Sequence, residues 1–315
     1  MIEFNGVSKY YDGVAAVSDL NLHCPEGAFT VLLGSSGSGK STTLKMINRL
    51  EPHDSGTLLF GGQDVRRIEV KSLRRRIGYA IQSVGLFPHW TVARNIATVP
   101  SLLGWERARI EARIDELLAL LGLEDGRFRN SYPHQLSGGQ QQRVGVARAL
   151  AADPEVLLMD EPFGALDPVT RSSLQQEVRR IHQLQGRTFV LVTHDVDEAL
   201  LLADRLVVMD QGRVIQQGSP AELLTRPATP FVRDFFGGSE LGVRLLARRT
   251  VAQWLRPGEW LEGIEPIDEQ MTLREALSRF VEQGCQRLPV KSANGERRGV
   301  LHFCDLAAQE QESMP

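Results

Sequence analysis

A glycine-rich loop that contains a lysine and several serines carries the clearest chemistry in this 315-residue sequence. The loop matches the pattern G-x-x-x-x-G-K-[S/T] and consists of Gly34, Ser35, Ser36, Gly37, Ser38, Gly39, Lys40 and Ser41. In this pattern the glycines let backbone N–H groups turn towards phosphate oxygens, and the following helix adds its N-terminal dipole. Lys40 is predicted to contact the β- and γ-phosphates of a nucleotide, and the Ser41 hydroxyl is predicted to bind Mg²⁺.

Four further polar residues follow buried apolar segments. Asp160 and Glu161 end "VLLMDE", Gln82 follows "GYAI", and His194 follows "FVLVT". We predict that Asp160 reaches the metal ion and that Glu161 orients or deprotonates the attacking water. Gln82 is predicted to sense metal and water, and His194 to hydrogen-bond the γ-phosphate. Each residue alone is common in a structural role, but together they fall where open α/β sheets place their ligands.

A second glycine-rich helix start lies about a hundred residues later, in "LSGGQ". Its residues are Ser137, Gly138, Gly139 and Gln140. A hydroxyl, two glycines and a helix N-terminus suit an anion, yet the first loop already accounts for the phosphates of one nucleotide. The alternative is a helix start that is merely softened by glycine. We favour a head-to-tail pair of chains in which each nucleotide lies between Lys40 of one copy and Ser137 and Gly139 of the other.

The elements that must position these residues are strands alternating with helices. "FTVLLG", "EVLLMDEP" and "TFVLVTH" are continuous apolar runs, and helical patterns follow the first and the third. Such alternation predicts an α/β fold with a mainly parallel sheet. Residues 86–150 have a helical pattern and are predicted to form an inserted helical subdomain of a first domain that spans residues 1–237.

The remainder, residues 238–315, is predicted to be a smaller α+β region beyond a hinge at Gly237 and Gly238. Within it, residues 268–308 are typical of a helix, a strand, a turn at Asn294 and Gly295, a strand and a final helix.

Composition excludes several classes of protein. A formal net charge of −3 disfavours general attraction to nucleic acid. The three cysteines lack the spacing of a metal site or a disulfide framework. The sequence predicts no signal peptide and no apolar run of the roughly 20 residues that a membrane-spanning helix needs.

The order of these motifs resembles the nucleotide-binding subunit of ABC transporters over about three quarters of the chain. The motifs are GSSGSGKS, Gln82, LSGGQ, LLMDEP, the triplet Ala165-Leu166-Asp167, and His194. The resemblance implies a P-loop NTPase core that binds ATP and Mg²⁺, with the phosphate site extending to Thr42. It also implies that Tyr11, or alternatively Tyr10, stacks on adenine. Gln82 would lie at the junction with a membrane subunit, and Asp167 at the dimer interface.

A narrower resemblance concerns importers of quaternary amines such as glycine betaine, choline and carnitine, most of all osmoprotectant uptake systems of the Yeh/Osm type. It rests on "KMINRL", "GYAIQSVGLFPHWTVARNIATVP" and "MDEPFGALDPVTR". It implies transmembrane permease subunits as partners and, indirectly, a periplasmic substrate-binding protein. The chain would then act at the cytoplasmic face of the bacterial inner membrane.

Two other segments have open interpretations. Residues 86–90 (LFPHW) either pack inside the helical subdomain or form a groove for a short helix of the membrane subunit. The C-terminal unit resembles a single CBS repeat. In it His302 stands where a Ser or Thr commonly precedes the Asp of the ligand motif, here Asp305, which disfavours adenosine binding and leaves a regulatory or dimer-stabilising role, or a vestigial tail.

Competing functions are an ABC ATPase for another small solute, a soluble ABC ATPase that acts on nucleic acid or ribosomes, and a regulatory nucleotide binder without hydrolysis. The single cassette, the short insertion and the lack of basic surplus disfavour the nucleic-acid class. Glu161 disfavours a binder that does not hydrolyse.

Overall fold

The computed structural model describes residues 1–81, 85–123, 126–237 and 241–307. The chain forms two compact units, Met1–Val232 and Arg233–Pro315, and each is described by itself. In the part of the chain that is described, no helix has both the length and the apolar character required to cross a bilayer.

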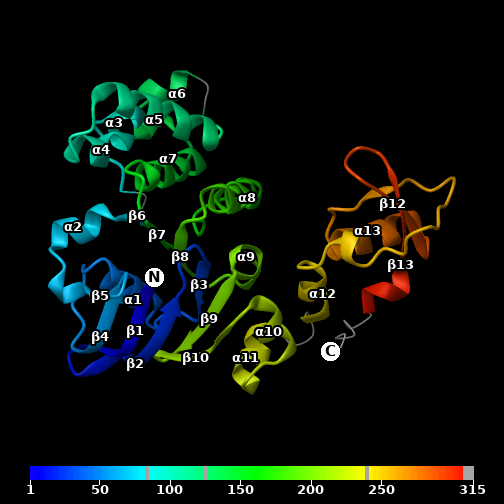
Figure 1. Ribbon diagram of the computed structural model, residues 1–315, viewed down its shortest axis with the longest axis horizontal. Helices are drawn as coiled ribbons and strands as arrows, with labels where there is room; N and C mark the ends of the chain where they lie inside the picture. Colours follow the sequence, from blue (N-terminus) through cyan, green and yellow to red (C-terminus); the bar gives the residue numbers. More distant parts are fainter. Residues whose placement is uncertain (82–84, 124–125, 238–240, 308–315) are drawn as a thin grey trace. The chain divides into compact units, whose positions relative to one another are not determined.

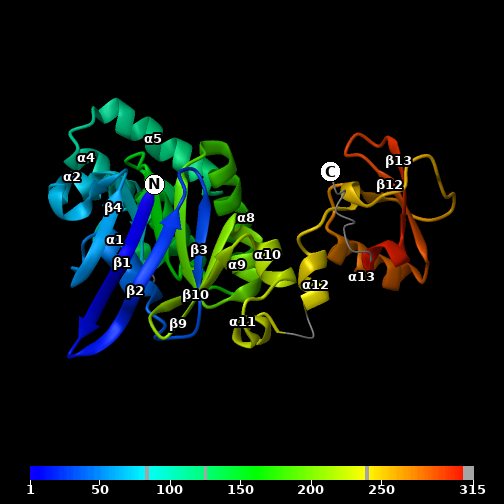
Figure 2. The same ribbon diagram turned by 60° about the horizontal axis from the view of Figure 1, so that its bottom comes forward.

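A six-stranded sheet forms the centre of the first unit (Figures 1 and 2). Its strands are, in sheet order, β10 (Arg213–Gly218), β9 (Arg205–Asp210), β3 (Phe29–Leu33), β8 (Thr188–Thr193), β7 (Val156–Asp160) and β6 (Ile77–Ala80). All neighbours are parallel except β9 and β10, which form an antiparallel hairpin through Gln211 and Gly212. Strands β3 and β8 are buried along their whole length, as their unbroken apolar sequences predict.

A second sheet of four antiparallel strands was not predicted. It consists of β2 (Val14–Cys24), β1 (Ile2–Tyr11), β4 (Ser55–Phe60) and β5 (Gln63–Asp64). The expectation of a mainly parallel sheet therefore holds for the central sheet alone, and the unit as a whole has mixed sheets. The pairing of β1 with β2 contains three register shifts, which interrupt the alternation by which a two-faced strand is recognised.

Helix α1 (Lys40–Ile47) shares one apolar core with both sheets. Its residues Leu44, Met46 and Ile47 are fully buried in a cluster that includes Phe4 and Phe60 from the four-stranded sheet. The same cluster takes in side chains of β3, β7, β8 and β9. Because the helix begins at Lys40, this packing fixes the phosphate loop against the sheet.

Within the described residues of the helical subdomain, five α-helices lie together in Figure 1. They are α3 (Val92–Ile96), α4 (Thr98–Leu102), α5 (Arg107–Leu120), α6 (Arg127–Asn130) and α7 (Gly138–Leu150). Helix α5 buries Ile114, Leu117 and Leu118, which lie at helical spacing on one face. The remaining helices of the first unit are α2 (Val70–Arg75), α8 (Pro168–Gln185), α9 (Val196–Leu202) and α10 (Pro220–Thr225), and α11 (Pro230–Phe235) crosses the boundary between the units.

The second unit has its own apolar core around a three-stranded sheet. Its elements are α12 (Leu241–Leu246), β11 (Ile267–Asp268), α13 (Leu273–Gln283), β12 (Arg287–Lys291) and β13 (Arg297–His302). The predicted order of helix, strand, turn and strand is confirmed over α13, β12 and β13. The predicted final helix is instead a short 3-10 turn, Phe303–Ala307. Gly238, half of the predicted hinge, lies outside the described residues.

Candidate nucleotide site

The phosphate loop (residues 34–41) joins β3 to α1 and depends on two glycines. Gly39 has a φ of 95°, and a Cβ there would lie 2.5 Å from the Ala16 carbonyl oxygen. A Cβ on Gly34 would collide with the Met209 carbonyl oxygen, so this position also excludes a side chain. Gly39 is the N-cap of α1, and no side chain caps the helix. The first amides of α1 are therefore available to an anion.

Lys40 is buried at the centre of this loop. Its Nζ donates to the carbonyl oxygens of Gly34 and Ser35 at 2.8 and 2.7 Å, and it lies 3.3 Å from the Ser38 hydroxyl. Burial lowers the pKa of the Lys40 ammonium, whereas the nearby carboxylates of Glu161 and Asp160 raise it. The remaining predicted residues of the loop, Ser36 and Gly37, are exposed, and Thr42 is half-buried on the first turn of α1.

Ser41 and Asp160 meet although 119 residues separate them in the sequence. The Ser41 hydroxyl donates to Asp160 Oδ1 at 2.9 Å, and the Tyr79 hydroxyl lies 3.5 Å from Asp160 Oδ2. A hydroxyl and a carboxylate provide the oxygen ligands that Mg²⁺ prefers when phosphate and water complete its shell. The described residues contain no cluster of three or more His, Cys, Asp or Glu side chains that could hold a metal by themselves. The pair therefore fits a metal ion that arrives with phosphate.

Glu161 and His194 lie at the ends of neighbouring strands, β7 and β8. Glu161 Oε1 and His194 Nδ1 are 3.3 Å apart. Glu161 has a φ of 46°, in the left-handed region that favours glycine, and its N–H donates to the Val192 carbonyl at 3.0 Å. A glutamate held in this backbone conformation indicates that the position of its carboxylate matters. The predicted third member of this group, Gln82, lies outside the described residues.

Tyr11, at the end of β1, is close to the first turn of α1. Burial raises the pKa of the Tyr11 phenol, as does the Glu51 carboxylate, while the Thr42 side chain lowers it. The ring is 42% exposed, and Lys9 Nζ lies 5.1 Å from its centroid. The interaction of its hydroxyl with the Thr42 side chain places Tyr11 beside the phosphate loop.

The second glycine-rich segment forms the start of α7. The Ser137 hydroxyl accepts from Gln140 N at 3.3 Å, and Gln140 Oε1 accepts from Ser137 N at 2.9 Å, which makes a capping box. A Cβ on Gly138 would meet nothing within 4 Å, whereas one on Gly139 would collide with the Thr170 methyl group. Gly139 thus lets α7 approach the first turn of α8.

Asp167 caps that neighbouring helix. Its carboxylate accepts from Thr170 N at 3.1 Å, and hydrogen bonds from Thr170 hold the pKa of this carboxyl below its usual range. The starts of α7 and α8 are therefore adjacent, and they bring together the second glycine segment and Asp167.

Asn95 is a residue that the sequence reading missed. It is fully buried at the end of α3, where its Oδ1 accepts from Phe87 N at 2.8 Å. Its Nδ2 lies 3.0–3.2 Å from the carbonyl oxygens of Phe87, Trp90 and Thr91. One amide thereby shapes residues 86–90, whose Phe87 ring is 44% exposed and packs on Trp90 with 4.4 Å between centroids.

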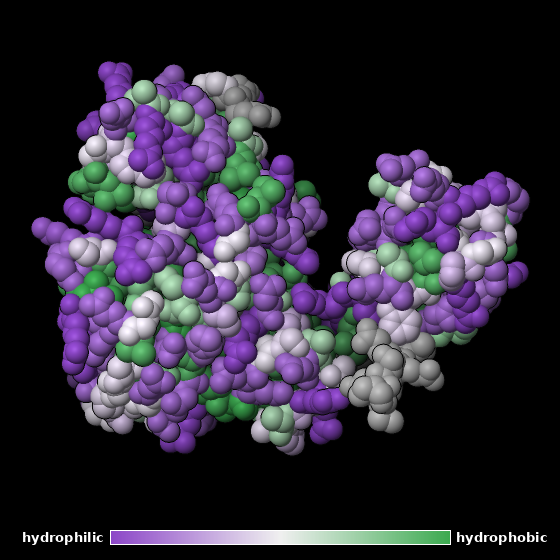
Figure 3. All heavy atoms as spheres, in the orientation of Figure 1, coloured by the Kyte–Doolittle hydropathy of each residue, from purple (hydrophilic) through white to green (hydrophobic). Residues whose placement is uncertain are grey.

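The face of the molecule in Figure 3 is largely polar, and one of its small apolar patches lies over α4, where Leu102 is 74% exposed.

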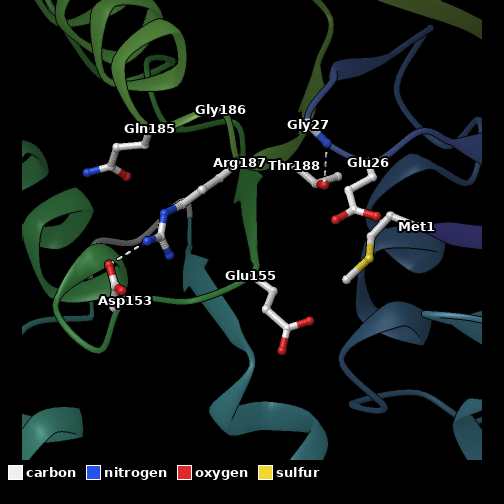
Figure 4. A pocket seen from close by; sticks show the side chains of 9 residues that line it. All are labelled: Met1, Glu26, Gly27, Asp153, Glu155, Gln185, Gly186, Arg187 and Thr188. Atoms are coloured by element: carbon white, nitrogen blue, oxygen red, sulfur yellow. Dashed lines mark hydrogen bonds and ion pairs between the residues drawn. The ribbon is translucent and has the colours of Figure 1, made fainter.

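A cavity of about 380 Å³ lies at the amino ends of the central strands (Figure 4). Gly27, Glu155 and Arg187, which line it, come just before β3, β7 and β8. Its charged groups are largely paired: Arg187 binds Asp153 at 2.6 Å, and Glu155 binds Arg76 outside the cavity at 2.6 Å. None of its nine described lining residues belongs to the predicted nucleotide site.

The chain is 66% identical over 309 residues to the glycine betaine uptake system ATP-binding protein YehX of Escherichia coli (strain K12), an alignment that covers 98% of this chain and 100% of that protein. The chain belongs to the ATP-binding subunits of ABC transporters. The ABC transporter family model matches residues 17–164 of this ABC subunit.

Other relatives share less of its length. The osmoprotectant import ATP-binding protein OsmV of Salmonella typhimurium (strain LT2) is 50% identical over 240 residues, 76% of this ABC subunit and 63% of OsmV. A solved dimeric structure of the ATP-binding cassette MJ0796, in a post-hydrolysis state with ADP and Pi, is 33% identical with a TM-score of 0.63. That likeness covers 70% of this chain and 98% of the cassette, so the P-loop fold of an ABC ATPase, which binds ATP, accounts for the first unit.

Proposed function

We propose that this ABC subunit hydrolyses ATP to energise the uptake of glycine betaine or related quaternary amines through a membrane importer. The proposal rests on five side chains that come together at the carboxyl ends of the central strands. They are Lys40, Ser41, Asp160, Glu161 and His194. The identity to YehX over nearly the whole chain supports the substrate class.

In the proposed site the phosphate loop and Lys40 hold the phosphates, and Tyr11 stacks on adenine. Ser41 and Asp160 hold Mg²⁺, which neutralises phosphate charge when bound. Glu161 accepts a proton from the attacking water, and His194, 3.3 Å from Glu161, hydrogen-bonds the γ-phosphate. Gln82 is assigned the role of sensing metal and water.

The site is proposed to be completed by a second copy of the chain in a head-to-tail dimer. Ser137, Gly138, Gly139 and Gln140 would then face the nucleotide of the partner, with Asp167 at the interface. The adjacency of the α7 and α8 starts supports this assignment, because both segments can meet one partner surface. The dimeric MJ0796 structures support the assembly.

The exposed part of residues 86–90 is proposed to contact a transmembrane permease subunit, which places the chain at the cytoplasmic face of the inner membrane. A periplasmic substrate-binding protein would act with the permease and without touching this chain. The half-exposed pair of Phe87 and Trp90 on a buried frame supports this surface.

For the organisation of the chain we propose a nucleotide-binding domain over residues 1–237 and a regulatory region over residues 238–315. The latter would contain a single CBS-like repeat at about residues 268–308 that regulates the transporter or stabilises the dimer. The separate apolar core of α13, β12 and β13 supports an independent module.

Replacement of the catalytic carboxylate tests the mechanism. Glu161→Gln should lower ATP hydrolysis by roughly 10²–10⁴-fold, because the general base is lost. ATP should then hold the variant as a stable dimer, as measured by light scattering after size exclusion. Glu116→Gln, an exposed glutamate in an ion pair with Arg113, is the matched control and should hydrolyse ATP normally.

Uptake completes the test. Cells that lack the chromosomal gene should regain uptake of labelled glycine betaine with the wild-type chain and the control, but not with Glu161→Gln. Normal turnover by Glu161→Gln would remove its assigned role, and restored hydrolysis without uptake of any quaternary amine would remove the substrate class.

A further inference from the structure

Arg171, in the first turn of α8, contacts two other turns of the chain. One of them precedes Asp167 and the other follows His194. Its Nη2 donates to the Leu166 carbonyl at 3.0 Å, in the turn that leads into Asp167. Its Nη1 lies 3.8 Å from Oδ2 of Asp195, the residue that follows His194 in the sequence. One guanidinium therefore contacts both turns, the first by a hydrogen bond and the second by an ion pair.

A second connection between α8 and α9 lies one turn further along each helix. Gln175 Nε2 donates to Glu198 Oε2 at 3.2 Å, and Glu198 is only 5% exposed. The backbone of the turn is held in the same place: Asp195 N donates to the Thr193 hydroxyl, and Glu198 N donates to Asp195 Oδ1, both at 3.0 Å. His194 is thus placed between two residues, Thr193 and Asp195, that are both fixed.

Glu198 is a buried carboxylate, and buried carboxylates are uncommon in contacts that serve stability alone. Four groups face it from the elements packed around it: Gln175 and Arg171 of α8, Thr193 of β8 and Asp195 before α9. Burial raises the pKa of the Glu198 carboxyl to about 7, and Asp195 raises it, while Thr193, Gln175 and Arg171 oppose the shift. A glutamine would make the same hydrogen bond without the desolvation of a charge. A buried carboxylate beside a reaction centre is therefore better explained by function than by stability.

We propose that Arg171 and Glu198 are positioning residues that lock the Leu166 turn to the His194 turn, so that the proposed interface segment and the hydrolytic pair keep one arrangement. Both residues act through the turn that carries His194. The inference rests on the proposed ATPase function. Ionised Glu198 supports the locked arrangement, because only the carboxylate carries the negative charge that attracts Arg171.

Arg171 is tested by kinetics of the full-length chain. Arg171→Ala should lower kcat for ATP hydrolysis roughly tenfold, equivalent to about 1.4 kcal/mol in the barrier, with KM for ATP unchanged within about twofold. Arg171→Lys should give an intermediate kcat, because a single ammonium cannot hold both acceptors in the same way. Arg180→Ala, on the same helix but in an exposed ion pair, is the matched control. An unchanged kcat in Arg171→Ala, or a rise in KM that accounts for the loss, overturns the assignment.

Glu198 is tested through the pH dependence of the ratio of kcat for wild type to kcat for Glu198→Gln. The ratio should rise as pH increases through about 7, because only the wild type gains a carboxylate there. A ratio that stays constant from about pH 5.5 to about pH 8.5 overturns the role of Glu198.

Stability provides a readout that separates the two roles. The folded-state pKa of Glu198 is raised above its unfolded value, so its contribution to stability is present at low pH and is lost as pH rises through about 7. The Tm of Glu198→Gln should therefore increase relative to wild type between pH 5 and pH 8. If the Tm difference changes with pH but the kcat ratio does not, Glu198 has a purely structural role. A wild type that fails to hydrolyse ATP instead removes the proposed function.

Discussion

The starts of α1 and α7 have similar compositions and different constructions. At α1, Gly37 and Gly39 adopt φ values of 78° and 95°, and no side chain caps the helix. At α7, the two glycines have ordinary helical backbones, and Ser137 and Gln140 cap each other. The first start leaves its amides open to phosphate, whereas the second already satisfies part of its own.

The glycines therefore do different work in the two places. Gly39 is required by its backbone conformation and by the Ala16 carbonyl behind it, whereas Gly139 is required because α8 lies against it. Gly138 is required by nothing within one chain, since a Cβ there would meet open space. The open space at Gly138 leaves room for the proposed approach of a second copy of the chain.

The largest effect is expected at the first start. Gly39→Ala should lower the free energy of unfolding by about 3 kcal/mol, because alanine is strained at this φ and its Cβ meets backbone. ATP binding, measured by calorimetry, should be lost. A variant that binds ATP with wild-type affinity would show that the loop tolerates another path, and the contrast with α7 would disappear.

An intermediate effect is expected at the packing glycine. Gly139→Ala should lower the free energy of unfolding by about 1–3 kcal/mol, because the added methyl overpacks against Thr170. Thr170→Ser removes the methyl group that collides, so the double variant should recover most of the loss in urea unfolding. Failure of this rescue would mean that Gly139 is required for a reason other than contact with α8.

The smallest change in stability is expected at the open glycine. Gly138→Ala should raise the free energy of unfolding by about 0.5 kcal/mol, because alanine loses less backbone entropy in a helix. Hydrolysis by the dimer should nevertheless fall, since the methyl group would stand where the partner's phosphates are proposed to approach. Full activity together with the gain in stability would argue against a shared site at Gly138.

Local signals predicted the parts of the site that depend on short stretches of chain. The unbroken apolar strands β3 and β8, and the loop between β3 and α1, occur as their sequences indicate. The four-stranded sheet was missed because bulges near Gly6 and Asp19 shift the register of β1 and β2, so their exposed and buried residues do not alternate regularly.

Two functional candidates were missed because their partners are distant in sequence. Glu198 follows the N-cap Asp195 by three residues, which is typical of a capping-box glutamate, but its side chain instead binds Gln175 on another helix. Asn95 occupies an ordinary helical position, and only the folded chain shows it surrounded by the carbonyls of residues 87, 90 and 91. No periodicity reports contacts of this kind.

The bonds that Asn95 makes have a consequence for how this surface can diverge. All four are to backbone atoms of residues 87, 90 and 91, so the course of the segment does not depend on which side chains it displays. Phe87, Pro88 and His89 are exposed and can be exchanged while the frame stays in place. In the proposed role of this surface, a gene duplicate acquires a different permease contact by changing a few outward side chains, while the buried frame around Asn95 is inherited intact.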